Sequence, residues 1–305
     1  MMQTFSIEPV TDPRWLSFVA SSDAATVFHH PAWIETLMRT YGYGSVSLAC
    51  GEGEHVAGVL PLLEIRSRLT GKRGVALPFS DYGGAAAESD AAHAALVDAA
   101  LGLQRERGWD FVELRSPLVH PLGQTSATFK RHTLRLDADQ DRLYRSFDKS
   151  GTQRGVSKFL KSGAIVERRT DHEALRAFMR LNYQTRRKHG LPPQPDRFFD
   201  ELQTHILDRD MGFVSLARLE GTVLAACVFL IHRQTVYYKF GASDEAHLSH
   251  RPNHGIMWEV IRWASTPGYR TLDFGRSDLD GEGLIRFKRG WGTVETDLTY
   301  VRLGS

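Results

Sequence analysis

The sequence predicts an α/β protein with two tandem domains, each built on a mixed, mostly antiparallel sheet flanked by helices. One observation is that the same order of elements occurs twice in the 305 residues: helix, hairpin, strand, helix, strand. Another is the composition, since 42% hydrophobic and 24% charged residues are typical of a folded chain with a substantial core. A third is the register of the turn glycines, because Gly53 and Gly108 have counterparts at Gly221 and Gly268.

The first half begins with a helix at 31–42, where apolar residues recur at intervals of three and four. A hairpin is expected at 45–65, because the Gly-Glu-Gly-Glu turn at 51–54 separates two apolar runs. The remaining elements of this half are a strand at 77–84, an Ala-rich helix from about residue 90 to 107, and a strand at 108–116.

The second half repeats this order after a basic, helical connector at 140–163. A strand at 164–169 and a long helix at 171–189 follow the connector, and the Gly-Leu-Pro-Pro run from Gly190 ends that helix because proline cannot continue it. The repeated elements are then a helix at 195–209, a hairpin at 212–231 turning at Glu220–Gly221, a strand at 235–245, a helix at about 253–265 and a strand at 268–277. The expected domains are therefore 1–136 and 137–305.

Charge is unevenly distributed along the chain. The formal net charge is only +2, yet the segment from Lys149 to Gly190 contains eleven Lys or Arg and three Asp or Glu. Such an excess indicates an anionic partner near this segment, for example a phosphate, a nucleotide or a nucleic acid. A solvated basic helix face explains the same pattern equally well.

Several classes of protein receive no support from the sequence. The longest apolar run, Val223 to Ile231, is far shorter than the roughly 20 residues of a membrane helix, and the N-terminus lacks the pattern of a secretory signal. Cys50 and Cys227 lie in apolar runs and are expected to be buried, without a disulfide or metal role. GxSxG and HExxH patterns are absent, so covalent acyl-enzyme and metal catalysis have weak support. We expect a cytoplasmic enzyme or binding protein without a tightly bound cofactor.

The element order is that of the GNAT acyltransferase fold, and short motifs narrow the resemblance further. The motifs lie at 28–33 and 77–84 in the first half and at 152–163, 183–192, 237–244, 273–277 and 286–292 in the second. Together they resemble the FemABX-like branch of the GNAT superfamily, the peptidoglycan bridge-forming aminoacyltransferases. The coiled-coil arm that some members carry is missing here.

This resemblance implies an aminoacyl- or acyltransferase that forms an amide bond on an amine of a cell-envelope precursor. Its implied co-substrates are aminoacyl-tRNA and a nucleotide-linked or lipid-linked cell-wall precursor. The second domain is expected to be active, while the first helps to form the acceptor groove. An acyl-CoA-dependent N-acyltransferase acting on a small amine or sugar is one alternative, although only Gly255 remains of the usual pyrophosphate loop. A non-catalytic module that binds an anionic ligand is another.

Two residues are candidates for catalysis. Lys288 lies in a short amphipathic helix expected to bury Leu284, Ile285 and Phe287, and the resemblance places this lysine near the transferred acyl group and the tRNA end. Its cation could neutralise the developing oxyanion or the leaving oxygen. Asp244 ends the strand at 235–245, where it could accept the proton of the amine or simply cap the next loop.

The candidates for substrate binding are mostly basic or polar. Thr185 and Arg187 lie in the last turn of the long helix, and the resemblance places Arg187 at a substrate diphosphate. The other candidates are Arg154 and Lys158 on one helix face, Asp81 in a Gly-flanked loop, and Tyr238, which could line the cleft or pack in the core.

Overall fold

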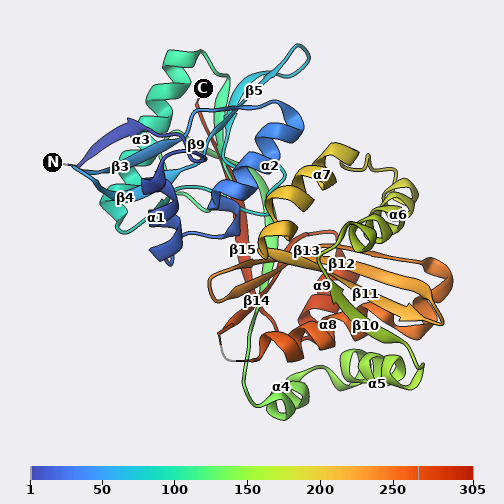
Figure 1. The fold of residues 1–305 in the computed structure, drawn as a ribbon. Coiled ribbons are helices and arrows are strands. Elements are labelled where there is room, and N and C mark those ends of the chain that lie inside the picture. Colours follow the sequence, from blue (N-terminus) through green and yellow to red (C-terminus); the bar gives the residue numbers. More distant parts are fainter. Residues whose placement is uncertain (1, 267, 305) are drawn as a thin grey trace. The chain divides into compact units, whose positions relative to one another are not determined.

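The computed structural model describes residues 2–266 and 268–304, which form two compact units. Unit 1 comprises Met1–Phe129 and Asp297–Ser305, and unit 2 comprises Lys130–Thr296. The tandem GNAT-like fold is confirmed, since each unit has a mixed, mostly antiparallel sheet arrangement with helices packed on it (Figure 1). Within the described ranges, no helix combines the length and apolarity that a membrane span requires.

Unit 1 contains two sheets, with strand orders β1-β3-β4-β7 and β15-β8-β6-β5-β2. Only β6 and β8 pair in parallel among the strand pairs described in this unit. Its strands are β1 (Gln3–Ser6), β2 (Gly44–Ser45), β3 (Leu48–Glu52), β4 (His55–Leu60), β5 (Leu63–Ser67), β6 (Gly71–Val75), β7 (Ala86–Ala87) and β8 (Phe111–Leu114). Its helices are α1 (Pro13–Ser21), η1 (Val27–His29), α2 (Pro31–Tyr41) and α3 (Asp90–Arg107). Strands β9 (Gly123–Arg135) and β15 (Val294–Leu303) belong partly to each unit.

Unit 2 has one sheet with the order β10-β11-β12-β13-β14-β9, in which β13 and β14 pair in parallel. Helices α6 and α7 lie on one face of this sheet, and α5 and α8 lie on the other (Figure 1). The strands are β10 (Ile165–Arg169), β11 (Gly212–Leu219), β12 (Thr222–His232), β13 (Thr235–Ser243) and β14 (Thr271–Asp278). The helices are α4 (Gln140–Ser146), η2 (Lys149–Gln153), α5 (Arg154–Lys161), α6 (His172–Lys188), α7 (Asp196–His205), η3 (Leu207–Arg209), η4 (Glu245–His250), α8 (Pro252–Ala264) and α9 (Glu282–Gly290).

The ends of the long helices follow ordinary capping chemistry. The Ser89 side chain accepts a hydrogen bond from the Ala92 amide at the start of α3, and Gly108 ends that helix in the left-handed conformation. The Asp171 side chain accepts from the Ala174 amide at the start of α6. These residue types are recognisable in a sequence, which is why both helices were predictable to within a residue or two.

One feature of the unit 2 sheet creates space for a ligand. Strands β13 and β14 pair only from Thr235 to Tyr237, opposite Thr271 to Asp273, and then part. In addition, Lys239 is the extra residue of a β-bulge in β13, which bends a strand and increases its twist. The carboxyl-terminal half of β13 is therefore free of β14.

The first half departs from the predicted element order. Residues 77–84 form a turn and not a strand, because Leu77 and Phe79 have φ angles of 55° and 62°, which a strand cannot contain. The hairpin β5–β6 precedes this turn in the chain and was not predicted. The long strands β9 and β15 were not predicted either.

The unit boundaries also differ from the expected ranges. The predicted boundary after residue 136 lies inside unit 2, and residues 297–305 belong to unit 1. The reason is hydrogen bonding, since β15 pairs with β8 over Val301–Leu303.

Candidate functional site

The most complete candidate site is a cavity of about 560 Å³ in unit 2, at the end of β13 where the strand has left β14. It brings together three of the predicted site residues, Thr185, Tyr238 and Asp244. The other lining residues come from α6, β13, η4, α8 and α9, and they are Gln184, Lys188, His189, Gly241, Ala242, Ser243, Glu245, Leu248, Asn253 and Leu284.

The bulged strand supplies one wall of this cavity. Tyr238 is half-buried, and burial raises the pKa of its phenol well above the usual range, so the hydroxyl stays protonated. The same burial raises the pKa of the neighbouring Cys227 thiol to about 12, and the two side chains share a hydrogen bond. A Cβ on Gly241 would lie 1.9 Å from the Tyr238 hydroxyl oxygen, so only glycine leaves room for this phenol. Tyr238 thus packs in the core and also lines the cleft.

Asp244 is the N-cap residue of η4, and both of its carboxylate oxygens take part in hydrogen bonds. Its Oδ1 accepts from the Ala246 amide at 3.0 Å, and its Oδ2 lies 2.9 Å from His247 Nδ1. The structure therefore shows Asp244 capping η4, one of its two predicted roles. Its other predicted role, that of proton acceptor, stays a prediction. A carboxylate has further lone pairs, so capping does not prevent it from accepting a substrate proton.

The last turn of α6 presents a different cation from the predicted one. Thr185 lines the cavity, but Arg187 is exposed and is not among the lining residues. Side chains two apart on a helix do not face the same way, whereas those three apart do. Lys188 accordingly lines the cavity beside Thr185, where it forms an ion pair with Glu245. Sequence reasoning missed Lys188 and Glu245, although the spacing of three from Thr185 would have found the lysine.

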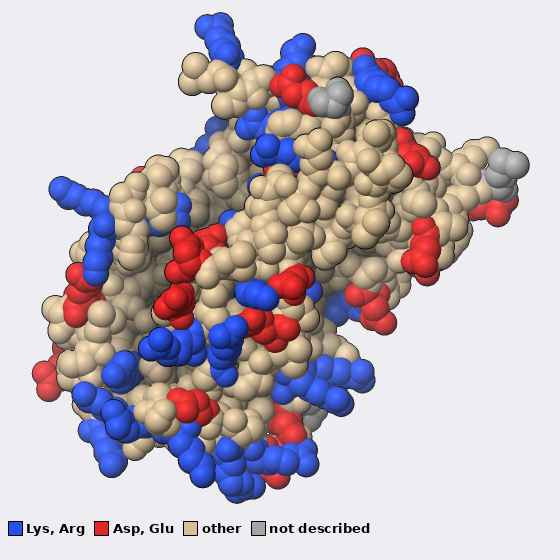
Figure 2. Space-filling model, turned by 180° about the vertical axis from the view of Figure 1, so that it is seen from behind, with Lys and Arg blue, Asp and Glu red and all other residues tan. Residues whose placement is uncertain are grey.

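The predicted anion-binding residues of α5 lie on the surface. Arg154 and Lys158 are exposed on one face of that helix. Figure 2 shows Lys and Arg side chains gathered at the lower end of the view, the end where α4 and α5 lie. Between α5 and α8, a Cβ on Gly255 would lie 2.3 Å from the Phe159 ring. Gly255 therefore permits close packing of the two helices.

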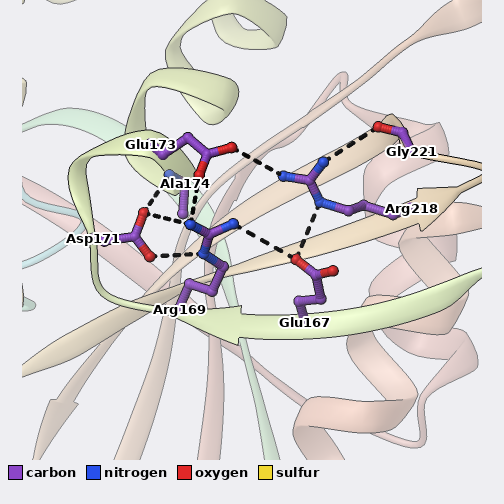
Figure 3. A network of polar contacts seen from close by, with 7 residues as sticks. All are labelled: Glu167, Arg169, Asp171, Glu173, Ala174, Arg218 and Gly221. Atoms are coloured by element: carbon purple, nitrogen blue, oxygen red, sulfur yellow. Dashed lines mark hydrogen bonds and ion pairs between the residues drawn. The ribbon is translucent and has the colours of Figure 1, made fainter.

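Not all cations of the basic segment are available to a ligand. Arg169 on the edge strand β10 contacts Glu167, Asp171 and Glu173, and Arg218 contacts Glu167 and Glu173 (Figure 3). In this network each positive charge is paired with negative charges of neighbouring residues, and the network lies along β10, the edge strand of the sheet. Charged side chains at a sheet edge discourage pairing with strands of other chains. We assign this network to edge protection.

Lys288 is buried rather than solvated, with only 2% of its surface exposed. Its Nζ donates hydrogen bonds to the carbonyl oxygens of Gly275 at 3.1 Å and Arg276 at 2.8 Å. Leu284, one helical turn earlier on α9, is 44% exposed and lines the cavity, so the expectation that it is buried is wrong. Lys288 itself is not among the residues that line the cavity, although Leu284 lies one turn away on the same helix.

His132 is fully buried close to this lysine. Burial, and then the Lys288 cation, lower the pKa of its imidazole to about 4. At neutral pH the ring is therefore uncharged, and its 3.9 Å approach to Glu295 is not an ion pair. The Thr293 hydroxyl donates to the Lys288 carbonyl oxygen and lies 3.4 Å from His132 Nδ1, so this nitrogen carries the proton.

The buried imidazole predicts a loss of stability in mild acid. An unfolded histidine takes up a proton near pH 6.5, but the folded one does so only near pH 4, so the unfolded state binds more protons between these values. The free energy of unfolding should fall by roughly 1–2 kcal/mol from pH 7 to pH 5 on account of His132. Urea unfolding of His132→Gln should show a flatter dependence, whereas exposed His172→Gln should match the wild type. Equal slopes for all three proteins would contradict the assignment.

Unit 1 contains a cavity of its own, of about 490 Å³. Its lining residues include Tyr43, Phe79, Arg73, Arg115 and Arg302. Asp81 is not among its lining residues, and the Asp81 carbonyl oxygen instead accepts a hydrogen bond from Tyr300 Oη at 2.6 Å. Glu113 also lines this cavity and forms ion pairs with Arg115 at 3.4 Å and Arg302 at 3.2 Å, so two of the three arginines already have an anionic partner.

No group of three or more His, Cys, Asp or Glu within 2–266 and 268–304 is arranged to hold a metal ion. Cys50 and Cys227 are buried free thiols, as the sequence predicts.

Comparisons with known proteins agree with the fold. Residues 148–289 match the family described as "Acetyltransferase (GNAT) domain". The chain is similar to FemX, with a TM-score of 0.78 and 18% identity over 98% of this chain and 96% of that one. A tandem GNAT protein from the clavulanic acid biosynthesis pathway has a TM-score of 0.58 and 13% identity, covering 99% of this chain and 98% of that one.

A lipid II:glycine glycyltransferase of Staphylococcus epidermidis is 32% identical over 97 residues, which cover 30% of this chain and 23% of that protein. The chain thus spans less than a quarter of the curated relatives it matches. The resemblance to the FemABX-like branch of the GNAT superfamily is confirmed.

Proposed function

Because the chain contains a GNAT domain and has the tandem fold of FemX, we propose that it is an aminoacyltransferase acting on a peptidoglycan-type precursor. The donor in this proposal is aminoacyl-tRNA, and the acceptor is an amine on a nucleotide-linked or lipid-linked precursor. The observation that carries the proposal is the cavity where β13 leaves β14, which gathers Thr185, Lys188, Tyr238 and Asp244 around one space.

The reaction requires no covalent enzyme intermediate. The amine nitrogen attacks the ester carbonyl carbon of the aminoacyl-tRNA, an amide C–N bond forms, and the ester C–O bond breaks. The terminal ribose hydroxyl of the tRNA leaves with a proton, and the amine loses one. In this scheme Asp244 accepts the amine proton, and the buried charge of Lys288 stabilises the oxyanion, because electrostatic effects are weakly screened in a buried site.

The acyl-CoA alternative is less well supported by the geometry of α8. Arg251 precedes this helix in the left-handed conformation, with no side-chain cap, and Pro252 supplies no amide at its first position. Gly255 is used for packing against Phe159. This helix start has one glycine and a proline, SHRPNHG at 249–255, in place of the glycine-rich run of free amides that usually holds a pyrophosphate.

The proposal is tested by incubating the purified protein with labelled aminoacyl-tRNAs or acetyl-CoA and either a nucleotide-linked muramyl pentapeptide or lipid II. Mass spectrometry should show the precursor gaining an aminoacyl residue, with release of uncharged tRNA. Acetyl transfer from acetyl-CoA alone would favour the alternative. Salt-sensitive binding of the precursor without any product would favour a non-catalytic module.

We also expect Lys188, rather than Arg187, to bind an anionic group of the precursor. Lys188→Gln should weaken binding of the nucleotide-linked precursor by about 1.5–3 kcal/mol, the range for hydrogen bonds to charged groups. Arg187→Gln is the matched control, since it removes a neighbouring cation outside the cavity. Calorimetric titration at two salt concentrations measures both. If only Arg187→Gln weakens binding of the precursor, Lys188 is not the anion-binding residue. Arg187, the residue that the family resemblance implies, would then bind the phosphate.

A further inference from the structure

The buried ammonium of Lys288 is held by a bend in β14, and this bend has a support of its own. Gly275 has a φ of 68°, a left-handed conformation in the middle of the strand, and its carbonyl oxygen accepts from Lys288 Nζ. Such a conformation strains most residues other than glycine, so the bend is a built feature of the strand. The following carbonyl, that of Arg276, accepts from the same ammonium.

The other side of the bend is fixed by a buried carboxylate. Asp273, 1% exposed, accepts the Gly275 amide on its Oδ1 at 2.7 Å. Gly275 therefore bonds through its amide to Asp273 and through its carbonyl to Lys288. Asp273 is also the last β14 residue paired with β13, so the support lies at the point where the two strands part.

An arginine from β9 completes the arrangement. Arg131 donates to Asp273 Oδ2 from Nε at 2.9 Å and from Nη2 at 2.6 Å. This two-bond contact neutralises the buried carboxylate and fixes its orientation, whereas an isolated buried carboxylate would be costly. A chain of directed bonds thus runs from Arg131 through Asp273 and Gly275 to Lys288.

We propose that Asp273 and Arg131 are positioning residues, which hold the Lys288 ammonium in place through the bend at Gly275. The catalytic value of this placement rests on the proposed function, but the placement itself does not. Groups that stabilise a transition state must be held in a defined geometry before the reaction begins, and a buried ammonium on flexible carbonyls would lose that geometry.

The first test needs no substrate. Lys288 should be almost unreactive in a short pulse of acetic anhydride followed by peptide mass spectrometry, because its amine is buried and hydrogen-bonded. In Asp273→Asn the amide nitrogen faces the Arg131 donors, and Lys288 labelling should rise by about tenfold or more. Asp278→Asn, which neutralises an exposed carboxylate on the same strand, should label as the wild type does. Unchanged labelling of Lys288 in folded Asp273→Asn would overturn the proposal.

The second test uses the transfer reaction. Asp273→Asn should lower kcat by about tenfold with KM nearly unchanged and should shift the pH profile of kcat, as expected for a group that acts in the transition state. Arg131→Lys keeps the charge and should retain more activity than Arg131→Met. This difference tests the positioning role even if Asp273→Asn fails to fold. Equal kcat values for both Arg131 variants and the wild type would count against the proposal. Absence of turnover in the wild type, with Lys288 labelling as expected, would overturn the proposed function alone.

Discussion

Replacing Lys288 with methionine is expected to lower kcat for amide formation by about 100- to 1,000-fold, the usual effect of removing one preorganised charge or donor from a transition state. Methionine keeps most of the aliphatic stem, so the loss reports on the ammonium. The carbonyl oxygens of Gly275 and Arg276 lose their donor as well, and the free energy of unfolding should fall by about 1–3 kcal/mol. Single-turnover transfer from aminoacyl-tRNA measures the first effect, and urea unfolding measures the second.

Arg286→Met is the matched control, because it removes an exposed cation from the same helix. Its kcat should equal that of the wild type. If Lys288→Met transfers at the wild-type rate while losing stability, Lys288 is a structural residue and the oxyanion must be stabilised by another group.

The largest effect on stability is expected for Trp291→Ala. Trp291 is fully buried and packs edge-to-face on Phe147 at 5.2 Å, with His254 and Phe287 each 6.0 Å away. Truncating a buried aromatic to alanine costs about 3–5 kcal/mol, through lost burial and the cavity left behind. Urea unfolding of the purified variant, followed by circular dichroism, measures this cost.

A second substitution at the same position separates packing from hydrogen bonding. The indole Nε1 of Trp291 is buried and has no hydrogen-bond partner among the described residues. Trp291→Phe therefore removes no hydrogen bond and should cost less than half as much as Trp291→Ala. Leu160→Ala, on the exposed face of α5, should change stability by less than about 0.5 kcal/mol. A cost for Trp291→Phe equal to that of Trp291→Ala would contradict the assignment of the loss to burial and packing.

Lys288 and Trp291 lie in one short region of the chain. Lys288, Gly290 and Trp291 belong to a motif that the family resemblance singled out, yet their roles differ. Lys288 is held by the β14 carbonyls, whereas Trp291 anchors the end of α9 in the hydrophobic core. A Cβ on Gly290 would lie 2.4 Å from Thr152 Oγ1, so this glycine lets α9 approach η2. Stability and kcat should consequently respond to different substitutions in the same motif.

Elements whose signals are local were predictable from the residues alone. Helix α3 was predictable because Ser89 caps one end and Gly108 ends the other, and the hairpin β11–β12 because Glu220–Gly221 separates two apolar runs. The repetition of these local signals was sufficient to predict two GNAT-like domains. Strands β9 and β15 escaped prediction because their partners lie far away in the chain, so no local turn marks them.

Which side chains meet depends on how distant segments of the chain pack together. Thr185, Tyr238 and Asp244 are scattered along the sequence, and they line one cavity because β13 bends at Lys239 and leaves β14. The burial of Lys288 could not be predicted, since spacing within one helix does not specify which face packs against another element. Residue type and local spacing give the chemistry that is available, but hydrogen bonds between distant segments, such as Asp273 to Arg131, determine where that chemistry is placed.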